Sequence, residues 1–455
     1  MAGSVFVIPV LDRWLVYAPL HHASALVNRA AVCRLSEDRV QPEQEDLASL
    51  SSLIRSEPPG VPQPREGLVS PQFLGLIPTR ACNLRCVYCG FGAADGGCEV
   101  MDMALAVAAV DWMAADAQRR GRATLDVHFF GGEPFFARDV VEVVVHRTRA
   151  VAAEKGLVPR LEAATNGVYD EDCARFIGDY FEAVVLSFDG FPQVHDRRRS
   201  AVNGRGSFEA VARTARILSQ SPAELCFRVC VADDNVDHLA ETVSWFCRQF
   251  QPAAIDFETL QPTSGAEEAG LRPPDPYRFA AQFHSAGRIA SDQGVRPSYA
   301  AALRETPRTS FCPVGNDTLI LSPEGRVSAC YLPKQEWQAR GLDLEMGRFT
   351  VQGAMELDRR AIERVRSLAA AKPRCAKCFC RWSCAGGCHV NQSFPGCPQA
   401  YNDFCIQTRL ITACSLLAEL GADSLADRLL DDRSAMEALA LRTSDALEDC
   451  EEADG

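Results

Sequence analysis

The alternation of apolar and polar positions separates a short N-terminal part from the rest of the chain. Apolar runs at 5–10 and 14–20 predict two strands of a hairpin. Apolar residues at helical spacing over 23–35 and 47–54 predict two helices. The stretch 57–64, Glu-Pro-Pro-Gly-Val-Pro-Gln-Pro, is typical of a stiff extended linker. We therefore expect a small N-terminal α+β domain over residues 1–65.

From residue 73 onward, apolar strand-like runs alternate with helical stretches. The predicted strands cover 73–78, 126–130, 160–165, 183–188, 225–232 and 255–260, and the predicted helices cover 103–118, 137–155, 170–180, 208–218 and 235–250. This alternation indicates a parallel sheet with helical crossovers. Six such units are too few for a closed eight-stranded barrel. We therefore expect an α/β fold with a partial (β/α)6 barrel over residues 73–290, and chemistry at the C-terminal strand ends.

Three cysteines follow the first strand of this region. Cys82, Cys86 and Cys89 are spaced CxxxCxxC. An iron–sulfur cube needs four ligands, so three thiolates on one loop leave one iron open to another molecule. Zinc usually takes four N or S donors from two separated pairs, and CxxxCxxC is a poor match to either pair. The spacing therefore favours iron, with zinc as the alternative.

A second group of cysteines lies beyond the expected barrel. Two short predicted strands, 318–321 and 326–328, are joined by a turn that contains Gly325, and two cysteines bracket this hairpin. Further cysteines follow in the pattern CxxCx5CxxxC, with one more at Cys405. This pattern indicates metal binding, and zinc stays an alternative because paired CxxC ligands are common in zinc sites. We expect helices and an acidic tail over residues 411–455.

Composition and charge narrow the class of protein. Of 455 residues, 47% are hydrophobic and 24% are charged, as in ordinary soluble chains. A net charge of −13 argues against a nucleic-acid partner, because phosphate binding rests on an excess of Lys and Arg. The one dense basic run, at Arg197, Arg198 and Arg199, is expected to be a solvated loop.

The same survey indicates a reducing compartment. The N-terminus lacks the pattern of a secretory signal, and no apolar run approaches the ~20 residues of a membrane helix. We therefore expect a cytoplasmic protein without a membrane partner. Twenty cysteines in such a protein argue for metal or redox chemistry rather than a disulfide framework.

With Tyr88 before its third cysteine, the first loop resembles the signature of the radical S-adenosylmethionine (radical SAM) superfamily. The resemblance implies a [4Fe-4S] cluster on Cys82, Cys86 and Cys89, whose fourth iron binds the methionine part of S-adenosyl-L-methionine. It also implies that an electron from the cluster cleaves this cofactor to a 5'-deoxyadenosyl radical, which abstracts a hydrogen atom from the substrate. An external donor such as flavodoxin or ferredoxin would supply the electron.

Motifs at the later strand ends extend this resemblance. The GGEP motif after the second strand resembles the family's cofactor-amine motif, and its glycines let the backbone approach a ligand closely. After the fourth strand, a serine resembles the residue that shares the cofactor's carboxylate with an arginine on the fifth, and an arginine fork suits a carboxylate. The implied cofactor-binding residues are Tyr88, Gly131, Gly132, Glu133, Pro134, Thr165, Asn166, Ser187, Asp189 and Arg228.

Two other expectations concern the same strands. A surface position is the alternative for Arg228, although its alternation with Phe227 and Val229 favours the barrel interior. His195, Asp196 and Arg199 are expected to tie a loop together by hydrogen bonds rather than to act as acids or bases.

The second cysteine group resembles the SPASM domain, which carries auxiliary four-iron clusters, and the resemblance covers residues 305–410. It implies two auxiliary clusters, and with the first loop three [4Fe-4S] clusters in all. By motif position the outer cluster is bound by Cys375, Cys378, Cys384 and Cys405, and the inner cluster by Cys312, Cys330 and Cys388. The inner cluster then has an iron that is open to a substrate thiolate or amide, or capped by another group. Cys380 and Cys397 are candidates for that cap.

The order of these motifs resembles radical SAM enzymes that modify peptides. It implies a maturase of a ribosomally synthesised precursor peptide with a leader and a core, and we expect a thioether or carbon–carbon (cyclophane-type) crosslink. The alternatives are an anaerobic sulfatase-maturating, formylglycine-forming enzyme, a redox-cofactor peptide-maturing enzyme, and a non-enzymatic zinc-binding module. Tyr331 argues against the sulfatase alternative, because those enzymes carry an aspartate base after the second hairpin cysteine.

Two functions are possible for the N-terminal domain. It loosely resembles the winged-helix element of peptide maturases, to which a leader peptide adds as a strand at a sheet edge. It could equally be a structural cap on the barrel. The catalytic acid or base cannot be identified from the sequence.

Overall fold

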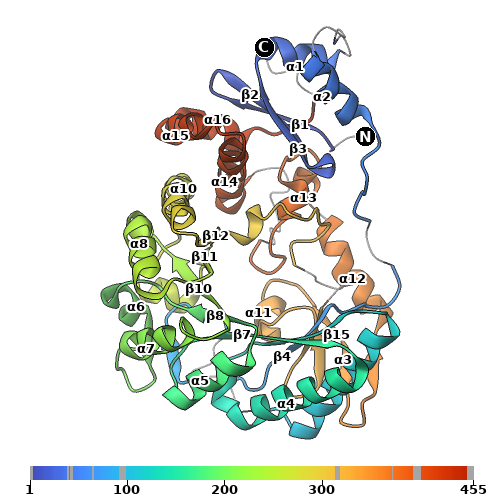
Figure 1. The fold of residues 1–455 in the computed structure, drawn as a ribbon, viewed down its shortest axis with the longest axis vertical. Helices are drawn as coiled ribbons and strands as arrows, with labels where there is room; N and C mark the ends of the chain where they lie inside the picture. Colours follow the sequence, from blue (N-terminus) through green and yellow to red (C-terminus); the bar gives the residue numbers. More distant parts are fainter. Residues whose placement is uncertain are drawn as a thin grey trace.

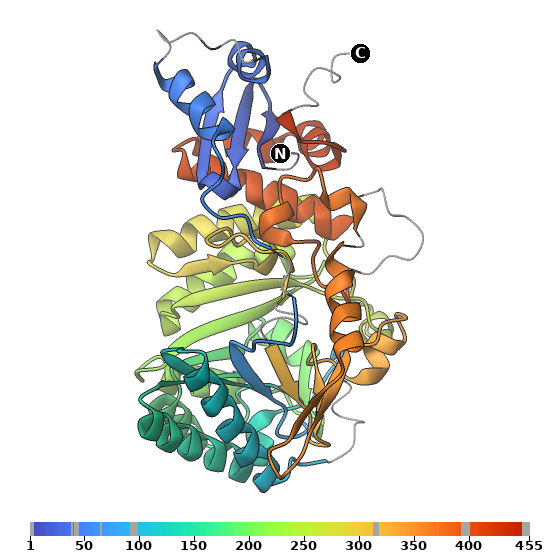
Figure 2. The ribbon, with the colours of Figure 1, turned by 90° about the vertical axis from the view of Figure 1, so that its right-hand side faces the viewer.

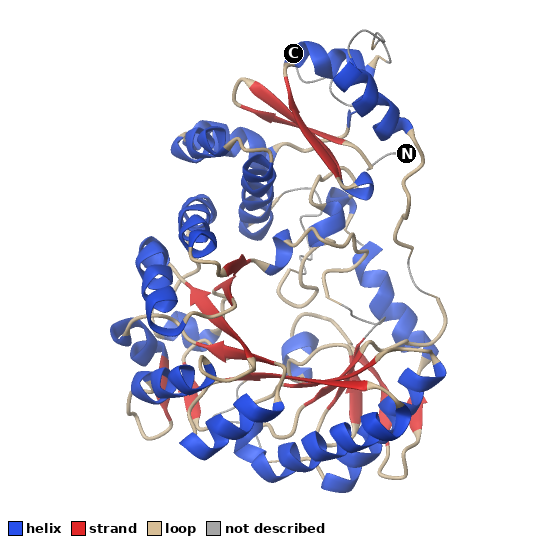
Figure 3. Cartoon of the chain, viewed as in Figure 1, coloured by secondary structure: helices blue, strands red, loops and turns tan. Residues whose placement is uncertain are grey.

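The computed structural model describes residues 4–37, 40, 45–63, 66–91, 99–312, 318–370, 372–392 and 401–447. An open, curved sheet forms the body of the molecule, and most helices lie on its outer side (Figures 1 and 3). The expected Cys397 and the acidic tail at 448–455 lie outside the described residues.

The predicted parallel strands are confirmed and lie side by side in chain order. They are β4 (Phe73–Leu76), β6 (Thr124–Phe129), β7 (Val158–Thr165), β8 (Ala183–Ser187), β10 (Glu224–Val231) and β11 (Ala254–Thr259). The crossover helices are α3 (Met103–Arg119), α4 (Arg138–Lys155), α5 (Glu171–Tyr180), α7 (Phe208–Leu218), α8 (Leu239–Phe250) and α10 (Pro276–Asp292). A seventh parallel strand, β12 (Arg296–Ser298), was not predicted, since it has three residues and contains a proline.

Alternate residues of these strands face opposite sides of the sheet. Val127, Val184 and Phe227 are fully buried on the side that the helices cover. Their neighbours Asp126 and Arg228 therefore face the open, concave side. Polar groups are thus gathered inside the partial barrel, where the sequence predicted chemistry.

The predicted hairpin 318–328 is confirmed, but it also extends the barrel sheet. β13 (Thr318–Leu321) pairs in parallel with β4, and β14 (Arg326–Ser328), β15 (Glu345–Phe349) and β16 (Met355–Leu357) follow antiparallel. One eleven-stranded sheet therefore runs from β12 to β16. The cysteine-rich part continues with α11 (Lys334–Gln338), α12 (Arg359–Ala370) and α13 (Arg381–Cys384), before α14 (Asp403–Glu419), α15 (Asp423–Asp431) and α16 (Arg433–Leu441).

The N-terminal part differs from the prediction in one element. β1 (Phe6–Val10) and β2 (Arg13–Ala18) form the predicted hairpin, but the expected helix over 23–35 is wrong in its first half. Residues Ala23–Val27 form β3, which pairs with β2, and α1 (Arg29–Ser36) begins only after Asn28, whose side chain accepts from Ala31 N at 2.9 Å. A short apolar run is ambiguous between strand and helix, and the cap at Asn28 decides it. The second predicted helix is α2 (Glu45–Arg55).

The N-terminal sheet packs against the C-terminal part of the chain (Figure 2). Phe6, Ile8 and Leu15 belong to the main hydrophobic core. Val7 N donates to Asp445 O at 2.7 Å, and Phe6 forms an antiparallel bridge with Ala446. The edge of β1 is therefore covered, whereas β3 pairs only with β2 among the described strands. No described helix is long and apolar enough to cross a bilayer.

Candidate functional site

The three-cysteine loop is held by a strand that the sequence did not reveal. β5 (Leu84–Cys86) pairs antiparallel with β9 (Arg199–Ala201), which places Cys86 opposite Arg199. Burial raises the pKa of Cys82 to about 11 and that of Cys86 to about 12, and the two thiols lie close enough to each other and to Cys89 for their charges to interact. Three cysteine sulfurs in one place, of which Cys89 is exposed, could bind the irons of a cluster as thiolates.

The basic run behind this loop was expected to be solvated, but only Arg197 is, with 58% of its side chain exposed. Arg198 is fully buried and donates to Cys230 O at 2.8 Å. Arg199 is 8% exposed and donates to both oxygens of Asp189, at 3.0 and 3.2 Å. The prediction is wrong for Arg198 and Arg199 because a buried carboxylate and a carbonyl from remote segments accept their hydrogen bonds, and a local charge pattern does not reveal such partners.

Tyr88 and Asp189 belong to this buried network. The Tyr88 hydroxyl donates to Asp189, and the Arg199 guanidinium lies 5.2 Å from the Tyr88 ring centroid. Burial acts to raise the pKa of Asp189, but the charge and hydrogen bonds of Arg199 outweigh it and lower the pKa to about 2. Asp189 is therefore a permanent anion that anchors the cysteine loop through Tyr88.

The expected hydrogen-bonded role of the histidine motif is confirmed. His195 Nδ1 accepts from Asp189 N at 3.3 Å, and its Nε2 donates to Ser207 Oγ at 3.0 Å. Asp196 accepts from Phe208 N at 2.8 Å. Burial lowers the pKa of His195 to about 4, so the ring is neutral and structural near pH 7.

The two glycines after β6 pack against the cysteine loop. A Cβ on Gly132 would lie 2.1 Å from Ala81 O, and one on Gly131 would lie 2.7 Å from Thr79 O. Gly132 N donates to Thr79 O at 3.2 Å, and Glu133 N donates to Ala81 O at 2.9 Å. Glycine is therefore required at both positions because the backbone of the cysteine loop lies so close, and not only for the approach of a ligand.

Replacing Gly132 by alanine should therefore weaken the cysteine loop. We expect Gly132→Ala to lower the free energy of unfolding by about 1–3 kcal/mol, because its methyl group overlaps a backbone oxygen that cannot yield cheaply. Denaturant unfolding and iron content after reconstitution measure both effects. Gly60→Ala is the matched control, since nothing lies within 4 Å of its Cβ and its φ is not positive; equal effects of the two changes would contradict the packing explanation.

Glu133 joins the ends of β6 and β7. Its carboxylate accepts from Thr165 Oγ1 at 2.8 Å, from Asn166 N at 2.7 Å and from Phe135 N at 3.2 Å. Burial raises its pKa to about 7, partly offset by these bonds. Both oxygens are therefore already engaged, and a direct bond to a cofactor ammonium stays a prediction.

Asn166 connects this strand end to the cysteines. Its side-chain amide donates to Cys82 Sγ at 3.5 Å and to Asn83 Oδ1 at 2.8 Å. Donors to a ligand sulfur are one of the means by which proteins tune iron–sulfur sites. The sequence assigned Asn166 to the cofactor, and the structure places it against the first of the three cysteines.

Ser187 and Arg228 are direct neighbours on β8 and β10. Arg228 Nη2 donates to Asp256 at 3.2 Å, whereas its Nε is buried and has no partner among the described residues. A buried donor without a partner is costly, and a carboxylate ligand would relieve that cost. Of the two expected positions for Arg228, the concave face is confirmed, and its chemistry fits the carboxylate of S-adenosyl-L-methionine.

The four expected outer ligands surround one small cavity. Cys375, Cys378, Cys384 and Cys405 all line it, together with Tyr401 and three arginines. Cys405 lies in the first turn of α14, where Asn402 Oδ1 accepts from its backbone N at 3.0 Å. Cys380 lines the same cavity, so the structure does not favour it as the cap of the inner cluster. The donor set fits four irons at this position.

The expected inner ligands come from the hairpin and the loop after α13. Burial raises the pKa of Cys330 to about 12, and the charge of Cys388 acts in the same direction because the two thiols are close. Arg308 donates to Phe311 O at 3.0 Å and lies within electrostatic reach of Cys312 and Cys384. Among the described residues, no three Cys, His, Asp or Glu side chains gather tightly enough for a single metal ion.

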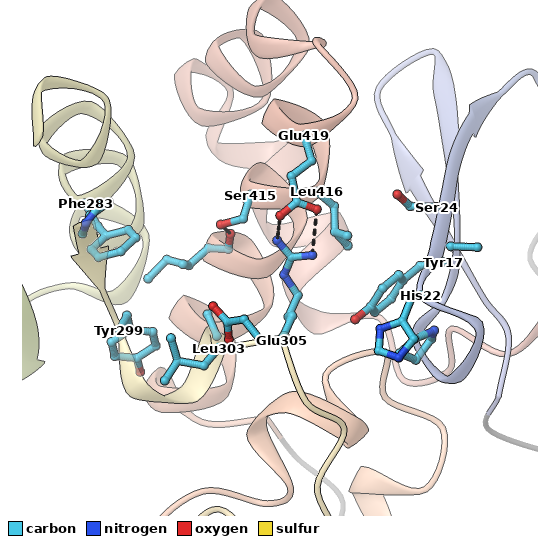
Figure 4. Close-up of a pocket in the computed structure, with 16 residues that line it drawn as sticks. Tyr17, His22, Ser24, Phe283, Tyr299, Leu303, Glu305, Ser415, Leu416 and Glu419 are labelled. Atoms are coloured by element: carbon cyan, nitrogen blue, oxygen red, sulfur yellow. Dashed lines mark hydrogen bonds and ion pairs between the residues drawn. The ribbon is translucent and has the colours of Figure 1, made fainter. Parts of the chain in front are cut away.

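A cavity of about 400 Å³ separates the N-terminal sheet from the barrel (Figure 4). Tyr17, Ala23 and Ser24 line it from β2 and β3, Tyr299 lines it from the chain after β12, and Leu416 and Glu419 line it from α14. The Arg304 guanidinium crosses it and donates to Glu419 at 3.1 Å, while its Nε has no partner in the described part of the chain. Gln407 Nε2 connects Tyr299 to Thr259 at the end of β11, at 2.7 and 3.1 Å.

Comparisons with known proteins agree with this geometry. Residues 76–246 match the model of the Radical SAM superfamily. A cysteine-type anaerobic sulfatase-maturating enzyme from Clostridium novyi is 25% identical over 40% of this chain, and the match spans 47%, about half, of that relative. The mycofactocin maturase of Mycolicibacterium smegmatis is 25% identical over 76% of this chain and 85% of its own length.

One solved structure shares the fold over most of the chain. The structure of native anSMEcpe with bound AdoMet and Kp18Cys peptide is 20% identical, with a TM-score of 0.60 over 76% of this chain and 99% of that one.

Proposed function

We propose that this radical SAM enzyme matures a ribosomally synthesised precursor peptide by forming a thioether or carbon–carbon crosslink. A radical SAM domain uses S-adenosyl-L-methionine and one [4Fe-4S] cluster. Two auxiliary clusters, a leader-binding N-terminal domain and an external electron donor belong to the proposal. The peptide substrate agrees with the Kp18Cys peptide bound in the structural neighbour and with the maturase named among the relatives.

The observation that carries the proposal is the uncovered edge of β3. The opposite edge of this sheet is closed by Asp445 and Ala446, whereas β3 pairs only with β2 among the described strands. Exposed backbone N–H and C=O groups on an edge strand are a template for an added peptide strand. A leader that pairs with β3 would lie beside the cavity that Ala23 and Ser24 line.

That cavity supports a path from the leader to the barrel. Its far wall contains Tyr299, which Gln407 connects to the C-terminal end of β11. Leu303, 38% exposed, and the Arg304–Glu419 ion pair offer an apolar contact and polar contacts to an extended chain. The core of the same peptide would then enter the concave face of the sheet.

The residues of the concave face have separate tasks. Arg228 and Ser187 would hold the cofactor's carboxylate, and Asp189, Tyr88 and Asn166 would hold the cysteine loop in place. When bound, S-adenosyl-L-methionine and its cluster supply the radical that removes a hydrogen atom from the substrate. Forming a crosslink is a net oxidation, and the residues around Cys330 and Cys378 would hold the auxiliary clusters that accept the surplus electron.

The position of Tyr331 favours crosslinking over formylglycine formation. Its ring lies 4.7 Å from that of Phe130, and a Cβ on Gly75 of β4 would meet its hydroxyl at 2.5 Å. Burial raises its pKa far above the ordinary value, so it stays protonated and cannot act as the base that an aspartate provides. A redox-cofactor peptide maturase stays the second candidate, since the mycofactocin maturase matches over 76% of this chain.

Anaerobic co-expression tests the proposed activity. Short peptides encoded beside the gene are expressed with the enzyme and analysed by mass spectrometry. A crosslinked peptide lighter by two hydrogens supports the proposal, whereas formylglycine in a cysteine-containing peptide supports the sulfatase alternative. A colourless protein that binds zinc and cleaves no cofactor would exclude all radical SAM functions.

Blocking the β3 edge should weaken leader binding. Val7 N donates to Asp445 and therefore points away from β2, so the backbone groups of its partner Val16 point toward β3. The backbone groups of Ala25, which is paired with Val16, point back toward β2. Because backbone groups alternate along a strand, the N–H of Ser24 points to the free edge. Ser24→Pro removes that donor without breaking the β2–β3 ladder. We expect the affinity for a fluorescently labelled precursor peptide, measured by anisotropy, to fall roughly two- to tenfold, since one edge hydrogen bond of about 0.5–1.5 kcal/mol is lost.

Ser24→Ala is the matched control, because it keeps the N–H and removes only the hydroxyl. Unchanged affinity in Ser24→Pro would favour the structural-cap function of this domain. Deleting residues 1–65 is a poorer test, because Phe6, Ile8 and Leu15 are part of the main core.

A further inference from the structure

Arg409 and Asp445 form an ion pair that is almost completely removed from solvent, with 1% and 0% of their side chains exposed. Arg409 lies in α14, about one turn after Cys405, and Asp445 lies after α16. Nη1 donates to Oδ2 at 2.7 Å and Nη2 to Oδ1 at 3.1 Å. Burying two charges is costly even with such geometry, so the pair is weak as a device for stability alone.

The same guanidinium contacts one of the proposed outer cluster ligands. Arg409 Nη1 donates to Cys378 Sγ at 3.3 Å. Its guanidinium carbon lies 4.7 Å from the ring centroid of Phe379 and 4.5 Å from that of Tyr401, which fix its position. Net charge and hydrogen bonds to sulfur are main determinants of a cluster's reduction potential. A buried cation that points at a ligand sulfur stabilises the reduced, more negative state.

Asp445 extends this contact to the N-terminal sheet. Its carboxylate also accepts from Phe379 N at 3.2 Å, and its backbone N donates to Lys377 O at 3.0 Å. Its backbone O accepts from Val7 N of β1 at 2.7 Å. Asp445 thus contacts Arg409, the loop that carries Cys378, and the edge strand β1 of the N-terminal sheet.

We propose that Arg409 is a positioning residue that sets the reduction potential of the outer auxiliary cluster through Cys378, and that Asp445 makes this potential depend on docking of the N-terminal sheet. The inference rests on the proposed function, specifically on Cys375, Cys378, Cys384 and Cys405 as ligands. Because energetic coupling is reciprocal, the state of the outer cluster also changes how firmly the N-terminal sheet is held. Leader binding and electron acceptance would then be linked.

Redox titration of the reconstituted full-length protein, followed by electron paramagnetic resonance, tests the potential. The outer cluster's signal is the one that Cys378→Ala loses, together with about four irons. Arg409→Gln removes the positive charge and should shift the midpoint to more negative values. Asp445→Asn removes the counter-charge with little change of shape and should shift it to more positive values. Arg433→Gln, in an exposed pair with Glu437, is the control and should leave it unchanged.

Shifts of opposite sign are the result that a merely structural role would not produce. Unchanged midpoints, or shifts of the same sign, in fully loaded variants overturn the inference. If Arg409→Gln fails to load the outer cluster, Asp445→Asn alone decides, because an upward shift supports the inference and no shift overturns it. If Cys378→Ala keeps every iron, the proposed ligand set itself is wrong, which is a different failure.

Hydrogen–deuterium exchange tests the link to the N-terminal sheet. We expect the amides of β1 to exchange faster in Asp445→Asn than in the wild type, and to exchange at different rates in the oxidised and reduced protein. Equal exchange of β1 in both redox states would overturn the coupling while leaving the role of Arg409 intact.

Discussion

In a triple variant with Cys82→Ala, Cys86→Ala and Cys89→Ala, formation of 5'-deoxyadenosine should fall below detection. Each thiolate is bound to a different iron of a cube, and without the cube no electron reaches the cofactor. The proposed auxiliary ligands lie on other segments, among them α13, α14 and the hairpin, so about eight of roughly twelve irons should remain. Iron analysis and chromatography of reaction mixtures measure the two quantities.

The control for this variant is Cys33→Ala, since Cys33 is an exposed cysteine of α1. It should keep all irons and full cofactor cleavage. Continued 5'-deoxyadenosine formation in the triple variant would refute the assignment of the first loop. Loss of all iron would instead mean that the clusters assemble together and that the three sites are not independent.

Arg228→Gln should raise the Kd of S-adenosyl-L-methionine by roughly 10- to 100-fold. Hydrogen bonds to a charged group contribute about 1.5–3 kcal/mol, and glutamine retains neither the charge nor the fork. The unpartnered Nε and the single bond from Nη2 to Asp256 leave the guanidinium free to accept an anion. Equilibrium dialysis with the cluster-loaded enzyme under anaerobic conditions measures the affinity.

Arg160→Gln serves as the comparison. Arg160 lies nearer the start of β7 on the same face, is 60% exposed and faces Asp126 at 3.5 Å. The Arg160→Gln change removes one positive charge from the concave face, as Arg228→Gln does, but leaves the proposed carboxylate site intact. If both variants bind the cofactor with the same Kd, the effect comes from net charge, and the specific role of Arg228 is wrong.

Most of the sheet could be predicted because its strands alternate strongly and their crossover helices are amphipathic. β3 and β12 could not, since five and three residues carry too little pattern to separate strand from helix or loop. The pairing of β13 with β4 joins segments that are distant in sequence, and periodicity holds no information on such contacts. The predicted boundary between barrel and cysteine-rich part therefore falls within one continuous sheet.

At the candidate site, residues that belong to a sequence motif could be predicted. Residues that hold the motif residues in place through hydrogen bonds from remote segments could not. Ser187 and Arg228 lie side by side because neighbouring parallel strands bring equivalent positions together. Arg198, Arg308 and Arg409 were missed because their partners are backbone carbonyls, sulfurs and carboxylates of remote segments. Arg409 directly precedes an apolar run in α14, and this local pattern could have indicated a buried charge.

The contact between β1 and the residues around Asp445 joins the two ends of the described chain. During synthesis, β1 leaves the ribosome long before Asp445 and Ala446 and exposes an unpaired edge until these residues have been made. Apolar Phe6 and Ile8 stay without their core for the same period. Until then the nascent chain is prone to aggregate through β1. Slow translation, or truncation before residue 445, should therefore lower the soluble yield more than the small size of the contact suggests.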